Sequence, residues 1–241
     1  MDLRITSLAT CTTEDADAIV KEQLQLETVD LEQLKTLGFR PLIGDSLEGW
    51  NTNLDSPQAK YTLNNGVISG VSNKLKNNTW LYTTEEFSDF LLYFEFRFDD
   101  MSGNSGLMYR SAHKDEKYAG LQYEMDNAVH SFAGTDYKRQ WTGLLYAENA
   151  GGWQFPKPKS PKSEKNKLSQ EGHKALDSTG WNAAFIRARG SDIQTWLNKQ
   201  IRVNFTIDNP DAPVSGAIAL QLHRGHSCAV SWRNIYILPL K

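Results

Sequence analysis

The feature that most constrains the fold of this chain is a long series of short strand-like segments. From Phe39 onward, apolar and polar residues alternate over short stretches, and Gly, Asn and Asp residues separate these stretches. In residues 61–70, for example, Asn65 and Gly66 lie between two such stretches and predict a β-hairpin. Hardly any helical spacing follows residue 40. The pattern therefore predicts an all-β sandwich or barrel.

The first part of the chain has a different pattern. In residues 13–37, Leu, Ile and Ala residues recur at helical spacing, acidic residues follow Thr13, and Gly38 fits a helix end. An interruption at residues 28–30 allows two short helices. We therefore expect residues 1–37 to form a helical N-terminal extension and residues 38–241 to form one β-sandwich domain.

Residues 154–178 interrupt the strand pattern. They contain six lysines together with Pro156, Pro158 and Pro161. This composition predicts a long surface loop, which is either a solvated insertion or a rim beside a cleft.

Charge and motifs exclude several functions. The 241 residues carry 26 basic and 29 acidic side chains, a net charge of −3, which does not suit a dedicated nucleic-acid binder. No apolar run is long enough for a transmembrane helix. There is no phosphate-binding Gly-rich loop, no Gly-x-Ser-x-Gly motif and no Cys-x-x-Cys pair. Phosphoryl transfer, serine hydrolysis and thiol redox chemistry are therefore disfavoured.

Cysteines and targeting signals leave the compartment open. Cys11 and Cys228 could form one disulfide or remain free thiols. Residues 8–11 only weakly resemble a lipoprotein cleavage box, because the preceding apolar stretch is short and holds Asp2 and Arg4. No signal peptide of ordinary build begins the sequence.

Aromatic and polar residues suggest a carbohydrate ligand. The chain has seven Trp, nine Tyr and ten Phe, and sugar rings stack on flat aromatic faces, although a sandwich core also uses aromatic residues. Strand alternation places polar side chains of four strands on one face. This polar stripe contains Arg110, Gln122, Glu124, Asp126, Tyr146, Glu148, Gln221 and His223. A solvated outer sheet face would also be polar.

Several segments in order resemble one known family. These are Gly103–Arg110, Gly120–Asp126, Trp141–Glu148, Gly180–Asn182, Ile193–Asn198, Gly216–His223 and Trp232–Ile235. The chain resembles the 3-keto-disaccharide hydrolase domain family, which has a concanavalin A-like jelly-roll fold. Lys199 departs from the family pattern, where a glycine is usual.

The resemblance implies a concave sugar-binding face and cleavage of glycosides already oxidised to the ketone at C3. It also implies a bacterial protein that is periplasmic or secreted. Such chemistry needs a base for the C2 proton, a donor for the enolate oxygen and an acid for the departing oxygen. We predict Glu124 as the base, with a pKa raised by Asp126. His223 is the predicted proton carrier, and Glu148 competes for either role.

Further residues are predicted to bind substrate. Arg110 or Gln122 would face the enolate oxygen, and Trp141 and Trp153 would stack on sugar. The full predicted binding set is Asn104, Arg110, Gln122, Asp126, Trp141, Tyr146, Trp153 and Gln221. Oligomeric state is left open.

Two other functions remain open. Glu124 and Asp126 resemble part of the Glu-x-Asp-x-x-Glu strand of laminarinase-type glucanases, but the third acid is replaced by Val129. A non-catalytic carbohydrate-binding module would need only the aromatic and amide groups.

No cofactor is expected to be required, although a divalent metal such as Ca²⁺ could bind. Asp126, Asn127 and Asp136 are candidate oxygen ligands. His223 and His226 form a weaker candidate pair.

Overall fold

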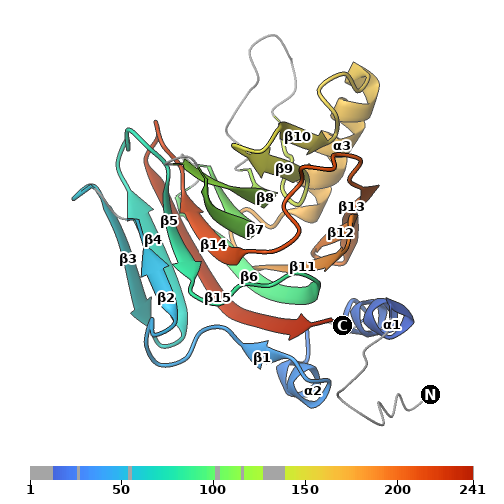
Figure 1. Cartoon of the computed structure of the whole chain (residues 1–241), viewed down its shortest axis with the longest axis horizontal. Helices are drawn as coiled ribbons and strands as arrows, with labels where there is room; N and C mark the ends of the chain where they lie inside the picture. Colours follow the sequence, from blue (N-terminus) through green and yellow to red (C-terminus); the bar gives the residue numbers. More distant parts are fainter. Residues whose placement is uncertain are drawn as a thin grey trace.

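The computed structural model describes residues 13–25, 28–53, 56–100, 104–114, 117–126 and 139–240 (Figure 1). Two antiparallel sheets pack against each other, as the strand pattern predicted. Sheet A contains β13 (Gln200–Thr206), β12 (Asp192–Leu197), β11 (Asn182–Arg189), β6 (Phe90–Asp100), β15 (Cys228–Pro239), β4 (Val67–Ser72) and β3 (Ala59–Asn64) in that order, and β1 (Arg40–Pro41) pairs with β15. Sheet B contains β10 (Gly152–Phe155), β9 (Leu145–Glu148), β8 (Lys117–Met125), β7 (Ser105–Lys114), β14 (Ala217–Leu222), β5 (Thr79–Thr83) and β2 (Trp50–Thr52).

The core between the sheets follows from the alternation. On β8, Leu121 and Tyr123 point inward, and the Tyr123 ring lies edge-on to Phe94 and Phe96 of sheet A. Because neighbouring residues of a strand point to opposite faces, Gln122 and Glu124 lie on the outer face of sheet B. The predicted jelly-roll sandwich is confirmed, and so is the predicted hairpin: Asn65 and Gly66 join β3 to β4 with positive φ angles of 49° and 73°.

Two helices cover part of the outer face of sheet A. They are α1 (Thr13–Gln23) and α2 (Leu31–Thr36). Ile19, Val20 and Leu34 pack against Tyr93 and Phe185. The predicted break at residues 28–30 is present, because the Asp30 side chain caps α2 by accepting from the backbone N–H groups of Glu32 and Gln33, both at 3.0 Å. None of the described helices is long and apolar enough to cross a membrane.

The prediction of a loop over residues 154–178 is wrong, because this segment contains helix α3 (Lys162–Ala175). Leu168, Gly172 and Ala175 share a buried face at the spacing i, i+4, i+7. The lysines obscured this sparse apolar stripe in the sequence. Helix α3 packs beside β13 (Figure 1). Cys228 is a buried free thiol, and Cys11 lies outside the described residues.

Candidate active site

A cleft of about 290 Å³ opens on the outer face of sheet B. Seven residues predicted from the sequence line it: Asn104, Gln122, Glu124, Tyr146, Glu148, Trp153 and His223. The structure adds Arg139 and His226 to the lining. The cleft therefore brings together residues from β8, β9 and β10 and from the segments that flank β7 and β14.

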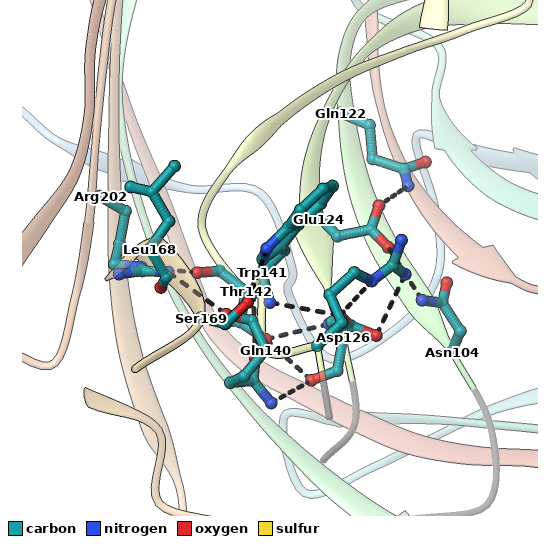
Figure 2. A network of polar contacts seen from close by, with 11 residues as sticks. Asn104, Gln122, Glu124, Asp126, Gln140, Trp141, Thr142, Leu168, Ser169 and Arg202 are labelled. Carbon is teal, nitrogen blue, oxygen red and sulfur yellow. Dashed lines mark hydrogen bonds and ion pairs between the residues drawn. The ribbon is translucent and has the colours of Figure 1, made fainter. Parts of the chain in front are cut away.

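Glu124 is held at the floor of the cleft by neighbouring polar groups. Asn104 Nδ2 donates to its Oε1 and Gln122 Nε2 donates to its Oε2, both at 2.9 Å (Figure 2). Arg139 Nη2 lies 3.5 Å from Oε1. Gly106, opposite Glu124 in register, makes room for this arrangement, since a Cβ there would lie 2.4 Å from Gln122 Cδ. Glu124 is thus a carboxylate fixed in position, with a donor on each oxygen.

Arg139 joins Glu124 to the second carboxylate, Asp126. Arg139 Nε and Nη2 lie 2.7 Å and 3.2 Å from the two oxygens of fully buried Asp126. Burial raises the pKa of Asp126, and Glu124 adds to that rise while Arg139 opposes it. Burial would lower the pKa of Arg139, but the attraction of both carboxylates outweighs it and the pKa is raised. Arg139 therefore remains charged.

The backbone next to Arg139 is fixed through Asp126. The Asp126 carbonyl accepts from Gln140 Nε2 at 2.8 Å and from Thr142 Oγ1 at 3.0 Å. Buried Arg202 of β13 donates from Nε to the Thr142 carbonyl at 2.9 Å (Figure 2). This segment is thereby tied to both sheets.

Helix α3 supports the same segment from outside. Arg202 Nη2 donates to the Leu168 carbonyl at 2.9 Å, and Trp141 Nε1 donates to Ser169 Oγ at 2.8 Å (Figure 2). The backbones approach closely at Gly172, where a Cβ would lie 2.1 Å from the Gln140 carbonyl oxygen. Helix α3, which was not predicted from the sequence, thus positions the segment that carries Arg139.

Glu148 is another carboxylate that lines the cleft. Burial raises its pKa, repulsion by Glu124 raises it further, and Arg224 partly opposes the rise. Its Oε1 accepts hydrogen bonds from Asn149 Nδ2 at 3.3 Å and from Asn78 Nδ2 at 3.5 Å. The direction of this shift suits Glu148 to donate a proton.

His223, in contrast to Glu148, has the properties of a proton acceptor. Burial lowers its pKa, so the neutral imidazole is favoured near neutral pH. Its Nδ1 lies 2.6 Å from the carbonyl oxygen of Arg224. Because a carbonyl only accepts, the proton of the neutral ring is assigned to Nδ1. Nε2 then carries the lone pair and can accept a proton.

Aromatic rings form one wall of the cleft. Trp153 lies edge-on to Tyr146 and Trp141, with ring centroids 5.1 Å and 4.6 Å away. The Arg139 guanidinium lies 5.4 Å from the Trp153 centroid. Trp153 and Tyr146 line the cleft, while Trp141 packs behind Trp153.

Residues 38–238 match the model of the 3-keto-alpha-glucoside-1,2-lyase-like domain family. The chain belongs to this family. The match confirms the resemblance drawn from the sequence and includes every residue of the cleft. Helices α1 and α2 lie outside the matched region of the 3-keto-alpha-glucoside-1,2-lyase-like domain.

Solved structures share the fold of this lyase-like domain. A candidate glycosyl hydrolase from Parabacteroides distasonis ATCC 8503 aligns with a TM-score of 0.61 at 18% identity, covering 87% of this chain and 97% of the other. A second candidate glycosyl hydrolase from the same strain has a TM-score of 0.54 at 21% identity, covering 84% and 99%. No curated protein sequence matches the chain. At these identities the similarity establishes the fold.

Arg110, which was predicted to bind substrate, does not line the cleft. Arg110 has a positive φ of 48°, and the register of β7 against β8 shifts between Tyr109 and Ala112. This irregularity breaks the alternation on which the prediction depended. Arg110 is buried and donates to the Ser88 and Gly190 carbonyls, each at 2.7 Å, and to Asp89 at 2.9 Å.

Three other predicted binding residues do not line the cleft. Asp126 lies behind Arg139, and Trp141 supports Trp153. Gln221 lies on the outer face of sheet B but is fully buried. Arg139 was missed because it lies in no predicted strand, so strand alternation assigns it no face, and His226 was missed because it lies beyond the end of β14.

The predicted calcium ligands are only partly described. Both Asp126 oxygens contact Arg139, whereas Asn127 and Asp136 lie outside the described residues. Within the described ranges, no group of three or more His, Cys, Asp or Glu side chains is placed to hold a metal ion. Metal binding stays a prediction.

Proposed function

We propose that this domain cleaves the glycosidic bond of 3-keto-glycosides by removing the C2 proton and releasing the C1 substituent. The observation that carries the proposal is that His223, whose Nδ1 faces the Arg224 carbonyl and leaves Nε2 as the acceptor, lines the same cleft as the carboxyl group of Glu148. This elimination requires a proton acceptor and a proton donor within reach of the same sugar, and the lowered pKa of His223 and the raised pKa of Glu148 suit these two roles. Membership of a 1,2-lyase-like family supports it.

In this mechanism His223 Nε2 accepts the C2 proton. The electron pair of the C2–H bond moves toward the C3 ketone and forms an enolate. When the ketone re-forms, a C1=C2 double bond is made and the C1–O bond breaks. Glu148 donates its proton to the departing oxygen. The products are an unsaturated 3-keto sugar and an alcohol, and addition of water to the double bond would give net hydrolysis.

Glu124 receives a different role from the one predicted from the sequence. Two amides and Arg139 already contact its two carboxylate oxygens, which holds the side chain in place. We assign it to orienting a sugar hydroxyl group beside His223. Arg139, which lines the cleft, takes the place once predicted for Arg110 as the cation that stabilises the enolate.

A carbohydrate-binding module is the second candidate function. The aromatic wall formed by Trp153 and Tyr146, together with the amides of Asn104 and Gln122, would suffice for sugar binding. Product analysis separates the candidates: a keto-sugar enzyme cleaves only the oxidised substrate, a glucanase-type hydrolase cleaves the unoxidised parent, and a binding module cleaves neither.

The test uses a 3-keto-disaccharide and its unoxidised parent, with product analysis by NMR. The wild-type protein should cleave only the oxidised sugar. His223→Asn and Glu148→Gln should each lower turnover by about 10²–10⁴-fold. His173→Asn, on the exposed side of α3, is the matched control and should match the wild type. Full activity of His223→Asn would refute the assignment. Treatment with EDTA followed by Ca²⁺ tests metal dependence.

A further inference from the structure

A second group of rings lies on the outer face of sheet B, outside the cleft. Trp80 and Tyr82 of β5, His113 of β7 and Tyr118 of β8 contact one another, and we call them the aromatic platform. Tyr118 lies 4.9 Å from Trp80, 5.3 Å from Tyr82 and 5.0 Å from His113, measured between ring centroids. Trp80 and Tyr118 are buried, Tyr82 is half-buried and His113 is exposed. Tyr82 and His113 therefore present ring surface to a ligand.

The register of sheet B places the platform beside the cleft. Gln122 pairs with Met108, Met108 with Ala219, and Ala219 with Tyr82. Neighbouring strands are about 4.8 Å apart, so the backbones of Gln122 and Tyr82 are separated by about 14 Å. Two joined sugar rings match this length scale. A ligand in the cleft can therefore extend onto the platform.

Glu148 lies at the border between the two regions. It lines the cleft, and Asn149 links it to the platform: Asn149 Nδ2 donates to the Tyr118 carbonyl at 2.8 Å and to Glu148 Oε1 at 3.3 Å. An acid that protonates a leaving oxygen must lie between the sugar that reacts and the group that departs. With the reacting sugar in the cleft, the departing group extends toward Tyr118.

Polar atoms that lack a hydrogen-bond partner among the described residues lie both at the platform and at the cleft. Gln221 is opposite Trp80 in register. In the described part of the chain, both Gln221 side-chain polar atoms and Trp80 Nε1 are buried without a hydrogen-bond partner. Gln122 Oε1, at the cleft, is also unpaired there. Buried unpaired polar groups are costly and rare, which marks this part of sheet B as more than a packing surface.

We propose that the aromatic platform is the subsite for the leaving group and that it takes a second pyranose ring. This inference rests on the proposed function, because it assigns the departing half of the same substrate. Tyr82 and His113 contact the ring face, and Trp80 and Tyr118 support them from the buried side. Selectivity for disaccharides over small glycosides follows.

The test compares kcat/KM for a 3-keto-disaccharide and for methyl 3-keto-glucoside, which has no second ring. Tyr82→Ala should lower the value for the disaccharide by about fivefold or more and leave the methyl glycoside unchanged. Tyr82→Phe, which keeps the ring, is the matched control.

Equal losses for both substrates, or no loss for either, would overturn the platform assignment and leave the proposed function intact. Failure of the wild type to cleave either substrate would refute the proposed function, and the platform with it.

Discussion

Glu124 on sheet B and Glu95 on sheet A form a natural comparison. Glu95 accepts hydrogen bonds from Tyr93 Oη at 2.7 Å, Arg233 Nε at 2.6 Å and Asn234 Nδ2 at 2.9 Å. Like Glu124, it is therefore held by an arginine and two neutral donors. Glu95 also lines a cavity, of about 360 Å³, between sheet A and the helical extension.

The surroundings of the two carboxylates differ. The described residues that line the Glu95 cavity include no histidine and no second carboxylate. The Glu124 cleft has both, and unpaired amides lie beside it. A paired carboxylate in a groove is therefore compatible with a purely structural role. The candidate active site is distinguished by the acid and base that Glu124 accompanies.

The largest expected effect is the loss of stability when the arginine that contacts each carboxylate is replaced. Arg139→Gln should lower the free energy of unfolding by about 3–5 kcal/mol, because it leaves fully buried Asp126 without its charge partner. Arg233→Gln should cost about 1 kcal/mol or less, since the Arg233 side chain is 38% exposed. Urea unfolding measures both. Equal costs would mean that the Asp126 pair is not effectively buried.

Activity should separate the two carboxylates themselves. Glu124→Gln should lower kcat/KM for a 3-keto-disaccharide about 100-fold, because the new NH2 group must face either the Asn104 donor or the Gln122 donor and so displaces the substrate. Glu95→Gln is the matched control on sheet A and should keep wild-type turnover. Unchanged turnover in Glu124→Gln would remove this residue from the site.

The support from helix α3 should be visible at Gly172. Gly172→Ala places a Cβ against the Gln140 carbonyl and should destabilise the protein by about 1–3 kcal/mol, with loss of turnover as Arg139 shifts. Gly44→Ala is the control, because a Cβ at Gly44 would meet no atom within 4 Å and its backbone is not in the left-handed region. Unchanged stability and turnover of Gly172→Ala would show that α3 can move away from Gln140 without a loss of folding free energy.

The smallest expected effect is the change of activity with pH. His223 must be neutral, and its pKa lies below the ordinary 6.5, so activity falls only as pH drops through that lowered value. Glu148 must be protonated, and its pKa lies above the ordinary 4.5, so activity falls as pH rises through that raised value. The two limbs predict a bell-shaped dependence of kcat/KM on pH. A rate that keeps rising to pH 8 would contradict these roles.

The sequence predicted those parts of the protein that depend on regular alternation. The sandwich, the hairpin at Asn65 and the common face of Gln122 and Glu124 follow from a period of two. Arg110 was misplaced because a local irregularity in β7 breaks that period. Helix α3 was missed because its apolar stripe is only a few residues wide among lysines.

Other parts of the site depend on contacts between distant segments. Arg139 contacts Asp126 and Glu124 because α3 and Arg202 hold the segment that carries it. No local sequence pattern predicts contacts of this kind between distant segments. The protonation states of His223 and Glu148 depend on burial, which only the folded chain shows.

The most direct test of the account is hydrogen exchange at C2 in the variant that lacks the acid. Glu148→Gln is incubated with a 3-keto-disaccharide in D₂O, and deuterium at C2 and released alcohol are followed together by NMR. Because His223 is intact, we predict deuterium at C2 of uncleaved substrate with little release, and His223→Asn should show neither. Release without C2 exchange in the wild type and both variants, or cleavage of the unoxidised parent, would contradict proton abstraction at C2.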